Sequence, residues 1–280
     1  MAGSDGTDIF TLSVGIGVIV TYASYLKRGD DVTLSGLTAV SMNEFAEILL
    51  GGSIIIPAAF VFFGPVIIGD VANSGAFNLG FVTMPLIFGH MPFSEVLGFL
   101  WFTLLFLAGV TSSVSLSQPA VAFLEDEFDI SRERAVAMFG VVTFVLCNGA
   151  IFFLGKGVVD ELDFWGGTFC LVLFATIEVI LFGWIFGIEK AWEEVHHGAD
   201  MRIPGIYKFI IKYVTPLFLL VVLFTWFFQE WLPIIRMDNV SAESRPYVLA
   251  TRIGLCLLFL TLAILVKIAW RKRKNKGKPA

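Results

Sequence analysis

Charged residues are scarce in this sequence of 280 residues. Asp, Glu, Lys and Arg together make up 15% of it, whereas soluble globular domains carry about 25%. Hydrophobic residues make up 57% and the mean hydropathy is +0.84. These values exclude a soluble domain, and they exclude a disordered chain because disorder requires low hydrophobicity and high net charge. The composition therefore predicts an all-α integral membrane protein with short water-facing loops.

Cysteine and histidine are also rare, with three residues each. Cys147, Cys170 and Cys256 lie in apolar stretches without metal-ligand spacing, so we expect buried small residues rather than disulfides. The histidines fall in predicted loops, and neither an HExxH motif nor a Ser-His-Asp arrangement occurs in the sequence. The sequence therefore predicts neither enzymatic activity nor a bound cofactor.

Long uncharged stretches indicate the membrane helices, each of which needs about 20 residues to cross about 30 Å of hydrocarbon. We predict seven helices, at residues 9–26, 48–69, 96–124, 135–155, 164–188, 206–230 and 246–268. Together they form a single transmembrane domain over residues 1–280. Residues 70–94 are apolar but interrupted by Gly, Asn and Pro, which favours an external loop with short helices.

The distribution of basic residues predicts the orientation. Fifteen of the 19 Lys and Arg residues fall in one set of alternate connections, and basic residues are retained on the cytoplasmic side. We therefore expect a multi-pass protein of the plasma membrane with residues 271–280 as a basic cytoplasmic tail. The tail lacks stacking aromatics and nucleic-acid motifs, so nucleic acid is not an expected partner. Seven crossings place the N-terminus outside without a signal peptide, which suggests missing upstream residues.

The first predicted span contains the unusual sequence FTLSVGIG at residues 10–17. Gly15 and Gly17 allow the helix to unwind, and unwinding frees carbonyl groups that bind cations or ammonium groups in secondary transporters. Residues 1–27 are therefore predicted to form a partly unwound helix. Close packing of small residues against another helix explains the same segment equally well.

The third predicted span carries a polar stripe in the sequence AGVTSSVSLSQP, residues 108–119. Thr111, Ser112 and Ser115 lie one turn apart on one helix face. Their hydroxyl groups suit a hard monovalent cation. For any single one of them, a hydrogen bond back to its own helix is the commoner role.

Two carboxylates fall inside predicted spans, where a charge is costly and indicates a functional site. Glu47 shares one helix face with Asn43, four residues earlier. Glu178 has fewer polar neighbours in the sequence, and we interpret it as a structural hydrogen-bonding residue.

The sequence resembles the neurotransmitter:sodium symporters, in particular their prokaryotic amino-acid transporters. The resemblance spans residues 6–270 and is carried, in order, by FTLSVGIG (10–17), TYASYL (21–26), LSGLTA (34–39), GGSIIIPAA (51–59), GAFNLGFVTMP (75–85), GVTSSVSLSQP (109–119), AFLEDEF (122–128), DELDFWGGT (160–168), WIFGIEKAWEEV (184–195) and YVTPLFL (213–219). It implies a twelve-helix fold with inverted repeats, in which the substrate and two sodium ions bind between the unwound first and sixth helices.

The part of that fold that the resemblance covers is helices six to twelve. It therefore implies the C-terminal half of a sodium-coupled symporter for amino acids or similar small zwitterions. Such a half would be inactive without an N-terminal half, which we expect either to be encoded separately or to be lost from a truncated gene product. Sodium would serve as the coupling ion, and no other cofactor is implied.

The resemblance also assigns roles to individual residues. Those matching sodium ligands are Thr11 and Asn43 for the first ion and the Ala108 carbonyl, Thr111 and Ser112 for the second. Those matching substrate contacts are Phe10, Thr11, Ser13, Ile16, Ser112 and Leu116. Asp163 and Asp126 match the acidic partners of the extracellular and intracellular gates, and Glu47 resembles the fixed carboxylate of chloride-independent members.

A different class, the seven-helix receptors and photoreceptors, fits the number of predicted spans. A retinal protein requires a lysine in the middle of its last helix. Lys267 instead lies four residues before the basic tail, where its ammonium group would reach the membrane surface.

Overall fold

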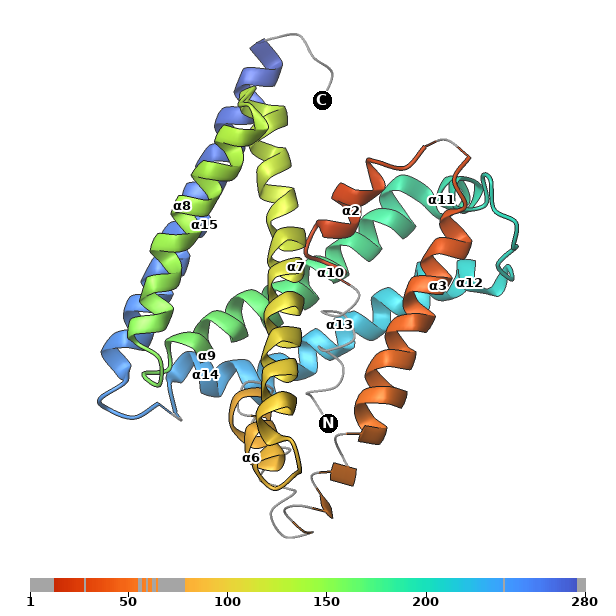
Figure 1. The fold of residues 1–280 in the computed structure, drawn as a ribbon. Coiled ribbons are helices and arrows are strands. Elements are labelled where there is room, and N and C mark those ends of the chain that lie inside the picture. The colour runs from red at the N-terminus through yellow and green to blue at the C-terminus, as the bar shows by residue number, and fades with distance from the viewer. Residues whose placement is uncertain are drawn as a thin grey trace. The chain divides into compact units, whose positions relative to one another are not determined.

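The computed structural model describes residues 13–27, 29–54, 57, 58, 60, 61, 64, 79–238 and 240–275 (Figure 1). Every regular element in these residues is helical. The chain divides into two compact units. Unit 1 contains Met1–Thr33 and Leu116–Ala280, and unit 2 contains Leu34–Ser115. Helix α7 (Ser94–Phe128) contributes to both units.

Five described helices are long and apolar enough to cross a membrane. They cover Ser94–Phe128, Arg132–Phe152, Val158–Val195, Ile206–Arg236 and Arg245–Asn275. Each overlaps one of the last five predicted spans, because an uninterrupted apolar run of this length is read directly from the sequence. The first two predicted spans lie partly outside the described residues, so the total of seven stays a prediction.

Three of these helices, α7, α8 (Arg132–Phe152) and α15 (Arg245–Asn275), are α-helical throughout. The other two alternate between α-helical and π-helical segments. The first contains α9 (Val158–Leu162), η3 (Asp163–Phe169), α10 (Cys170–Ile180), η4 (Leu181–Gly187) and α11 (Ile188–Val195). The second contains α12 (Ile206–Phe209), η5 (Ile210–Val214), α13 (Thr215–Trp226), η6 (Phe227–Trp231) and α14 (Leu232–Arg236).

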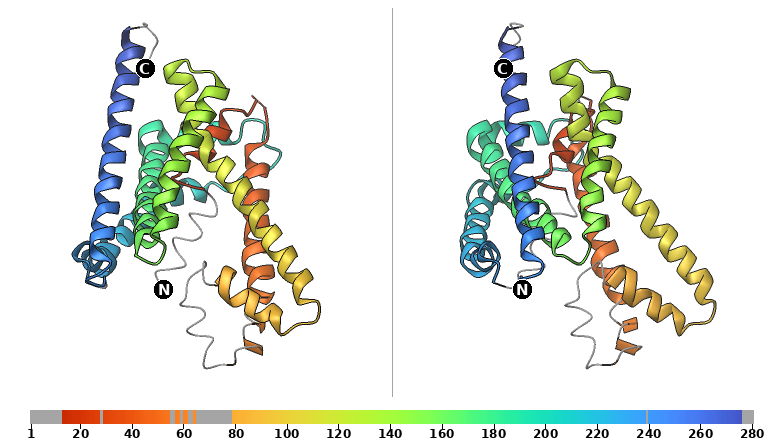
Figure 2. Two further views of the ribbon diagram at one scale, coloured as in Figure 1. Left: turned by 60° about the vertical axis from the view of Figure 1, so that its left-hand side comes forward. Right: turned by 90° about the vertical axis from the view of Figure 1, so that its left-hand side faces the viewer.

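Unit 1 is organised around the contact between α10 and α13 (Figure 2). Leu171, Val172 and Ala175 of α10 are buried, as are Leu219 and Trp226 of α13. This apolar packing fixes the position of α10, which carries Glu178.

Unit 2 contains α3 (Val32–Glu44, from Leu34), η1 (Phe45–Gly52), η2 (Leu79–Thr83), α6 (Met84–Gly89) and the first part of α7. The Trp101 indole donates a hydrogen bond to the Gly80 carbonyl at 3.0 Å, and its ring packs edge-on against Phe88. The described part of the predicted external loop, residues 79–94, thus forms a short helix packed on α7. Residues 70–78 lie outside the described residues, and the external placement stays a prediction.

The cysteines are free, as expected, but the expectation that they are buried is wrong for two of them. Cys147 and Cys256 are exposed on α8 and α15, and Cys170 is partly buried. Sulfur is tolerated on these faces because their neighbours are apolar and also exposed.

Candidate functional site

Residues 13–17 form no regular helix, and α2 (Val18–Ala23) begins only after them. Ser13, Gly15 and Gly17 have positive φ angles of 57°, 80° and 80°. Glycine adopts this backbone region without the Cβ clash that other residues meet. The two glycines therefore permit the unwound path of the chain. Phe10 and Thr11, both predicted to contact the substrate and the second also predicted to bind sodium, lie outside the described residues.

Glu178 of α10 holds this unwound segment. Its Oε2 accepts a hydrogen bond from the backbone N–H of Gly15 at 3.0 Å. A carboxylate in an apolar span needs such a partner, because an unpaired buried charge is costly. The predicted hydrogen-bonding role of Glu178 thus has a definite partner, 163 residues away in the sequence.

The segment also packs tightly on α10. A Cβ added to Gly15 would lie 2.5 Å from the Leu171 carbonyl oxygen and 2.7 Å from the Ala175 nitrogen. At Gly17 the nearest atom, the Pro119 Cβ, would be 3.8 Å away. Unwinding and close packing, the two explanations that the sequence left open for the glycines, therefore apply together at Gly15.

The predicted substrate residues are divided between the two units. Ser13 and Ile16 are half-buried in the unwound segment of unit 1, and Leu116 is exposed at the unit 1 end of α7. Ser112, which was assigned both to substrate and to sodium, is exposed in unit 2.

Asn43 and Glu47 lie together in unit 2, at the change from α3 to η1. The Asn43 amide donates a hydrogen bond to Glu47 Oε2 at 3.3 Å, and both side chains are half-buried. A π-helical turn often marks a functional position. The contact agrees with the prediction that the two residues, four positions apart, share one helix face. It keeps the carboxylate oriented toward the amide.

Two hydroxyl groups of the polar stripe on α7 bond back to their own helix. Thr111 Oγ1 donates to the carbonyl oxygens of Leu107 and Ala108 at 2.9 and 3.0 Å, and Ser113 donates to Gly109 in the same way at 2.7 Å. Two of the predicted sodium ligands, the Ala108 carbonyl and the Thr111 hydroxyl, are thereby adjacent. A cation bound there would have to replace the intrahelical hydrogen bond.

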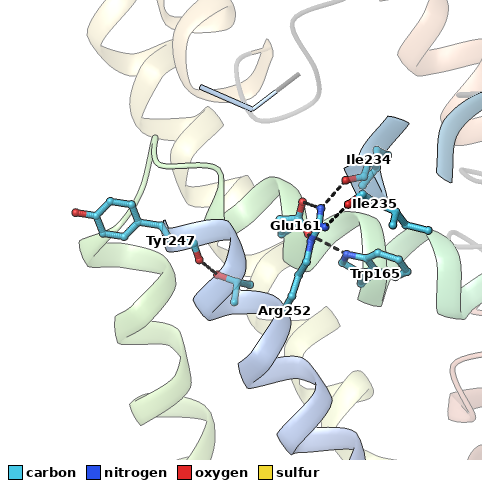
Figure 3. Close-up of polar contacts among 7 residues, drawn as sticks. Glu161, Trp165, Ile234, Ile235, Tyr247 and Arg252 are labelled. Atoms are coloured by element: carbon cyan, nitrogen blue, oxygen red, sulfur yellow. Dashed lines mark hydrogen bonds and ion pairs between the residues drawn. The ribbon is translucent and has the colours of Figure 1, made fainter. Parts of the chain in front are cut away.

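A buried ion pair fixes the end of α9, two residues before Asp163 (Figure 3). The Arg252 guanidinium of α15 makes two hydrogen bonds of 2.7 Å to Glu161, one to each carboxylate oxygen. Trp165 also donates to Glu161, at 2.8 Å. Only 17% of the Arg252 side chain and 7% of the Glu161 side chain are exposed.

Arg252 also binds the end of α14. It donates to the carbonyl oxygens of Ile234 and Ile235 at 2.6 and 2.9 Å. These carbonyls lie in the last turn of the helix, where the carbonyl groups lose their usual intrahelical partners; the Ile234 carbonyl also accepts from the Met237 N–H at 3.0 Å. One side chain therefore joins α9, α14 and α15. Sequence reasoning did not identify this pair, although both residues flank apolar spans and carry opposite charges.

A cavity of about 430 Å³ opens beside this ion pair. Its lining includes Asp160, Glu161, Phe164, Pro233 and Val248. Both acidic and apolar side chains therefore border it, from α9, η3, α14 and α15.

Lys156 and Glu243 form a second ion pair nearby, between the connections α8–α9 and α14–α15. Their hydrogen bond and mutual attraction lower the pKa of Glu243 and raise the pKa of Lys156. The contribution of the pair to stability is therefore present between the ordinary values of 4.5 and 10.5. It is lost as the pH falls through the lowered pKa of Glu243 or rises through the raised pKa of Lys156.

Asp163 itself begins η3 and is exposed. Its side chain lies over Gly167, where an added Cβ would be 3.0 Å from Asp163 Oδ1. No ion pair joins Asp163 to another residue in the part of the chain that the structure describes.

Asp126 is exposed near the end of α7, among carboxylates that are already paired. Glu125 pairs with Arg132 at 3.3 Å, Glu127 with Arg273 at 2.8 Å, and Asp129 with Lys272 at 3.2 Å. Within the described ranges no ion pair includes Asp126. The two predicted gate carboxylates therefore share one property: each lies beside a paired carboxylate and has no described cationic partner.

The comparisons with known proteins all lead to transporters. A model of the sodium:neurotransmitter symporter family matches residues 4–272. An uncharacterized sodium-dependent transporter of Methanocaldococcus jannaschii is 28% identical over 269 residues, which cover 95% of this chain and 52% of that protein. The sodium-dependent dopamine transporter of Bos taurus is 26% identical over 222 residues, which cover 76% and 31%, respectively.

A solved structure is similar as well. The crystal structure of MhsT in complex with L-phenylalanine matches with a TM-score of 0.63 and 25% identity, over 75% of this chain and 48% of that one. The chain thus spans at most about half the length of the curated relatives named above. Because the family model matches nearly the whole sequence, the chain belongs to the sodium:neurotransmitter symporter family.

Proposed function

We propose that these 280 residues form the C-terminal half of the transport pathway of a sodium-coupled symporter. The observation that carries this proposal is the unwound segment at Ser13–Gly17, held by Glu178 in a chain of the symporter family. A backbone hydrogen bond to Glu178 keeps the segment unwound without using its side chains. The side chains of Ser13 and Ile16 therefore remain available to a ligand.

The proposed substrate is an amino acid or a similar small zwitterion. The carbonyls of Phe10 and Thr11, with Ser13, would receive its ammonium group, and Ile16, Ser112 and Leu116 would border its side chain. The relatives support this class, since one solved relative is described in complex with L-phenylalanine. Phe10 would cover the bound substrate.

We assign two sodium sites to the chain, each incomplete by itself. Thr11 and Asn43 would contribute to the first, and the Ala108 carbonyl, Thr111 and Ser112 to the second. Support for the second comes from the adjacency of the Ala108 oxygen and the Thr111 hydroxyl, 3.0 Å apart. Carbonyl and hydroxyl oxygens are suitable ligands for a hard cation.

Replacing the proposed ligands of the second site should weaken sodium binding more than substrate recognition. In the transporter completed by an N-terminal half, Thr111→Val or Ser112→Ala removes one oxygen ligand from a cation that water cannot reach. The expected cost is about 1–3 kcal/mol, measured as a higher sodium concentration for half-maximal uptake in proteoliposomes. Substrate affinity should fall at low sodium and recover at high sodium, because linkage is reciprocal.

Ser115→Ala is the matched control, since it removes a hydroxyl one turn further along α7 without a proposed ligand role. Equal sodium defects in all three variants would show that the stripe serves packing.

Proteoliposomes that contain only residues 1–280 should show no sodium-driven uptake. Uptake by that preparation would contradict the proposal that these residues supply only half of the pathway.

Glu47 would supply the negative charge that other transporters take from chloride. The Asn43–Glu47 hydrogen bond supports this role, because it places the carboxylate beside a proposed sodium ligand. We therefore expect transport to be independent of chloride, and Glu47→Ser to create a chloride requirement. Uptake assays with gluconate in place of chloride test this, and chloride dependence with Glu47 intact would refute it.

Asp163 and Asp126 would act as the acidic halves of the outer and inner gates. Their exposure and the pairing of their neighbouring carboxylates support this, since each is available to a cation from the remainder of the transporter.

The protein would lie in the plasma membrane with its C-terminus in the cytoplasm. A separately encoded N-terminal half would be its partner if the two halves are not joined in one polypeptide.

A further inference from the structure

The C-terminal end of α15 carries basic residues on two opposite faces. One face contains Lys272 and Arg273, which pair with Asp129 and Glu127 at 3.2 and 2.8 Å. Ala269 lies on the same face and is 3% exposed. This face is used within unit 1, where it joins α15 to the end of α7.

The other face contains Lys267, Arg271 and Lys274, which we call the α15 basic stripe. All three residues are exposed, and none is ion-paired within the described residues. Spacings of four and three residues place them on one face of a helix. Because successive residues turn by about 100°, this face lies about half a turn from Ala269, Lys272 and Arg273.

The stripe begins where the apolar surface of α15 ends. Residues 253–266 carry no charge, and Lys267 follows them directly. Trp270 is 59% exposed, and exposed tryptophans are typical of the level of lipid headgroups. The position along the helix therefore places the stripe at the depth of lipid phosphate groups rather than in bulk water.

We propose that Lys267, Arg271 and Lys274 bind the phosphate groups of anionic phospholipids in the leaflet that faces the C-terminal end of α15. Basic residues directly after a membrane span attract anionic lipids. Lys267 would reach the phosphates along its apolar stem. Lys272 and Arg273 are excluded from this role because acidic partners already occupy them. The proposal is independent of the transported substrate and of the proposed sodium sites.

The test compares two double variants of the full chain that remove the same charge from the same helical turn. R271Q/K274Q alters the stripe, and K272Q/R273Q alters the opposite face. Each protein is purified in detergent and mixed with phosphatidylglycerol or with phosphatidylcholine of the same acyl chains. Native mass spectrometry then counts the lipids retained, and thermal unfolding reports on the fold.

We expect the unaltered protein to retain phosphatidylglycerol in preference to phosphatidylcholine. R271Q/K274Q should lower the affinity for phosphatidylglycerol on the order of tenfold and leave Tm unchanged. K272Q/R273Q should keep the lipid preference and lower Tm, because it leaves the Glu127 carboxylate, whose side chain is only 13% exposed, without its cationic partner. Equal loss of lipid in both doubles would overturn the proposal, as would the absence of a preference in the unaltered protein. Displacement of the lipid by millimolar glycerol 3-phosphate would identify a free-phosphate site instead and would also overturn it.

Discussion

Gly15→Ala is expected to lower the free energy of unfolding by about 3 kcal/mol or more. The φ angle of 80° costs a residue with a Cβ roughly 1–2 kcal/mol. The new methyl group would also lie 2.5 and 2.7 Å from backbone atoms of Leu171 and Ala175. An α-helix backbone cannot yield as a flexible side chain can, and such overpacking costs a further 1–3 kcal/mol or so. The measurement is thermal unfolding in detergent, with an expected fall in Tm of roughly 6–10 °C.

The variant Gly17→Ala distinguishes the cost of backbone strain from the cost of steric overlap with α10. Gly17 has the same φ of 80°, but its nearest neighbour is the Pro119 Cβ at 3.8 Å. We expect it to lose only the strain of about 1–2 kcal/mol. If the two variants were equally stable, close packing of the unwound segment on α10 would not be a determinant of its position.

Arg252→Gln is expected to destabilise the chain by about 3–5 kcal/mol, because it leaves the Glu161 carboxylate buried without a compensating charge. It also removes the donors to the last carbonyls of α14. The change is measured as the loss of Tm in detergent. Lys156→Gln is the control from the same region, and its exposed pair should leave Tm almost unchanged.

A second substitution tests the reason for the loss. Glu161→Gln combined with Arg252→Gln removes both charges, so the double variant should be more stable than Arg252→Gln alone. A double variant that loses the sum of the two single effects would show that the hydrogen bonds to α14, and not the unpaired carboxylate, dominate the stability of this cluster.

Sequence reasoning predicted the long apolar helices because the thickness of the bilayer sets their length. A run of that length is visible in one continuous stretch of the sequence. It also singled out Gly15 and Gly17, since a glycine-rich interruption in an apolar run is visible without a structure. It could not pair Gly15 with Glu178, because 163 residues separate them and only tertiary packing brings them together.

The same limit applies to charges and to helix geometry. The basic residues of the tail form one block in the sequence, whereas the structure divides those among residues 271–275 between two faces of α15. Arg252 lies near the start of the predicted span 246–268, and nothing in the sequence indicates that it joins three helices. The alternation of α-helical and π-helical turns has no sequence signature that we used.

The bond from Gly15 to Glu178 has a consequence for how this protein can change over evolutionary time. This hydrogen bond is donated by the main chain, so it does not depend on which side chains the neighbouring residues carry. Val14 and Ile16 are therefore free to be exchanged for residues of other size and polarity, while Gly15 and Glu178 keep the segment where it is. The segment thus separates the residues that can diversify recognition from the pair that preserves its geometry.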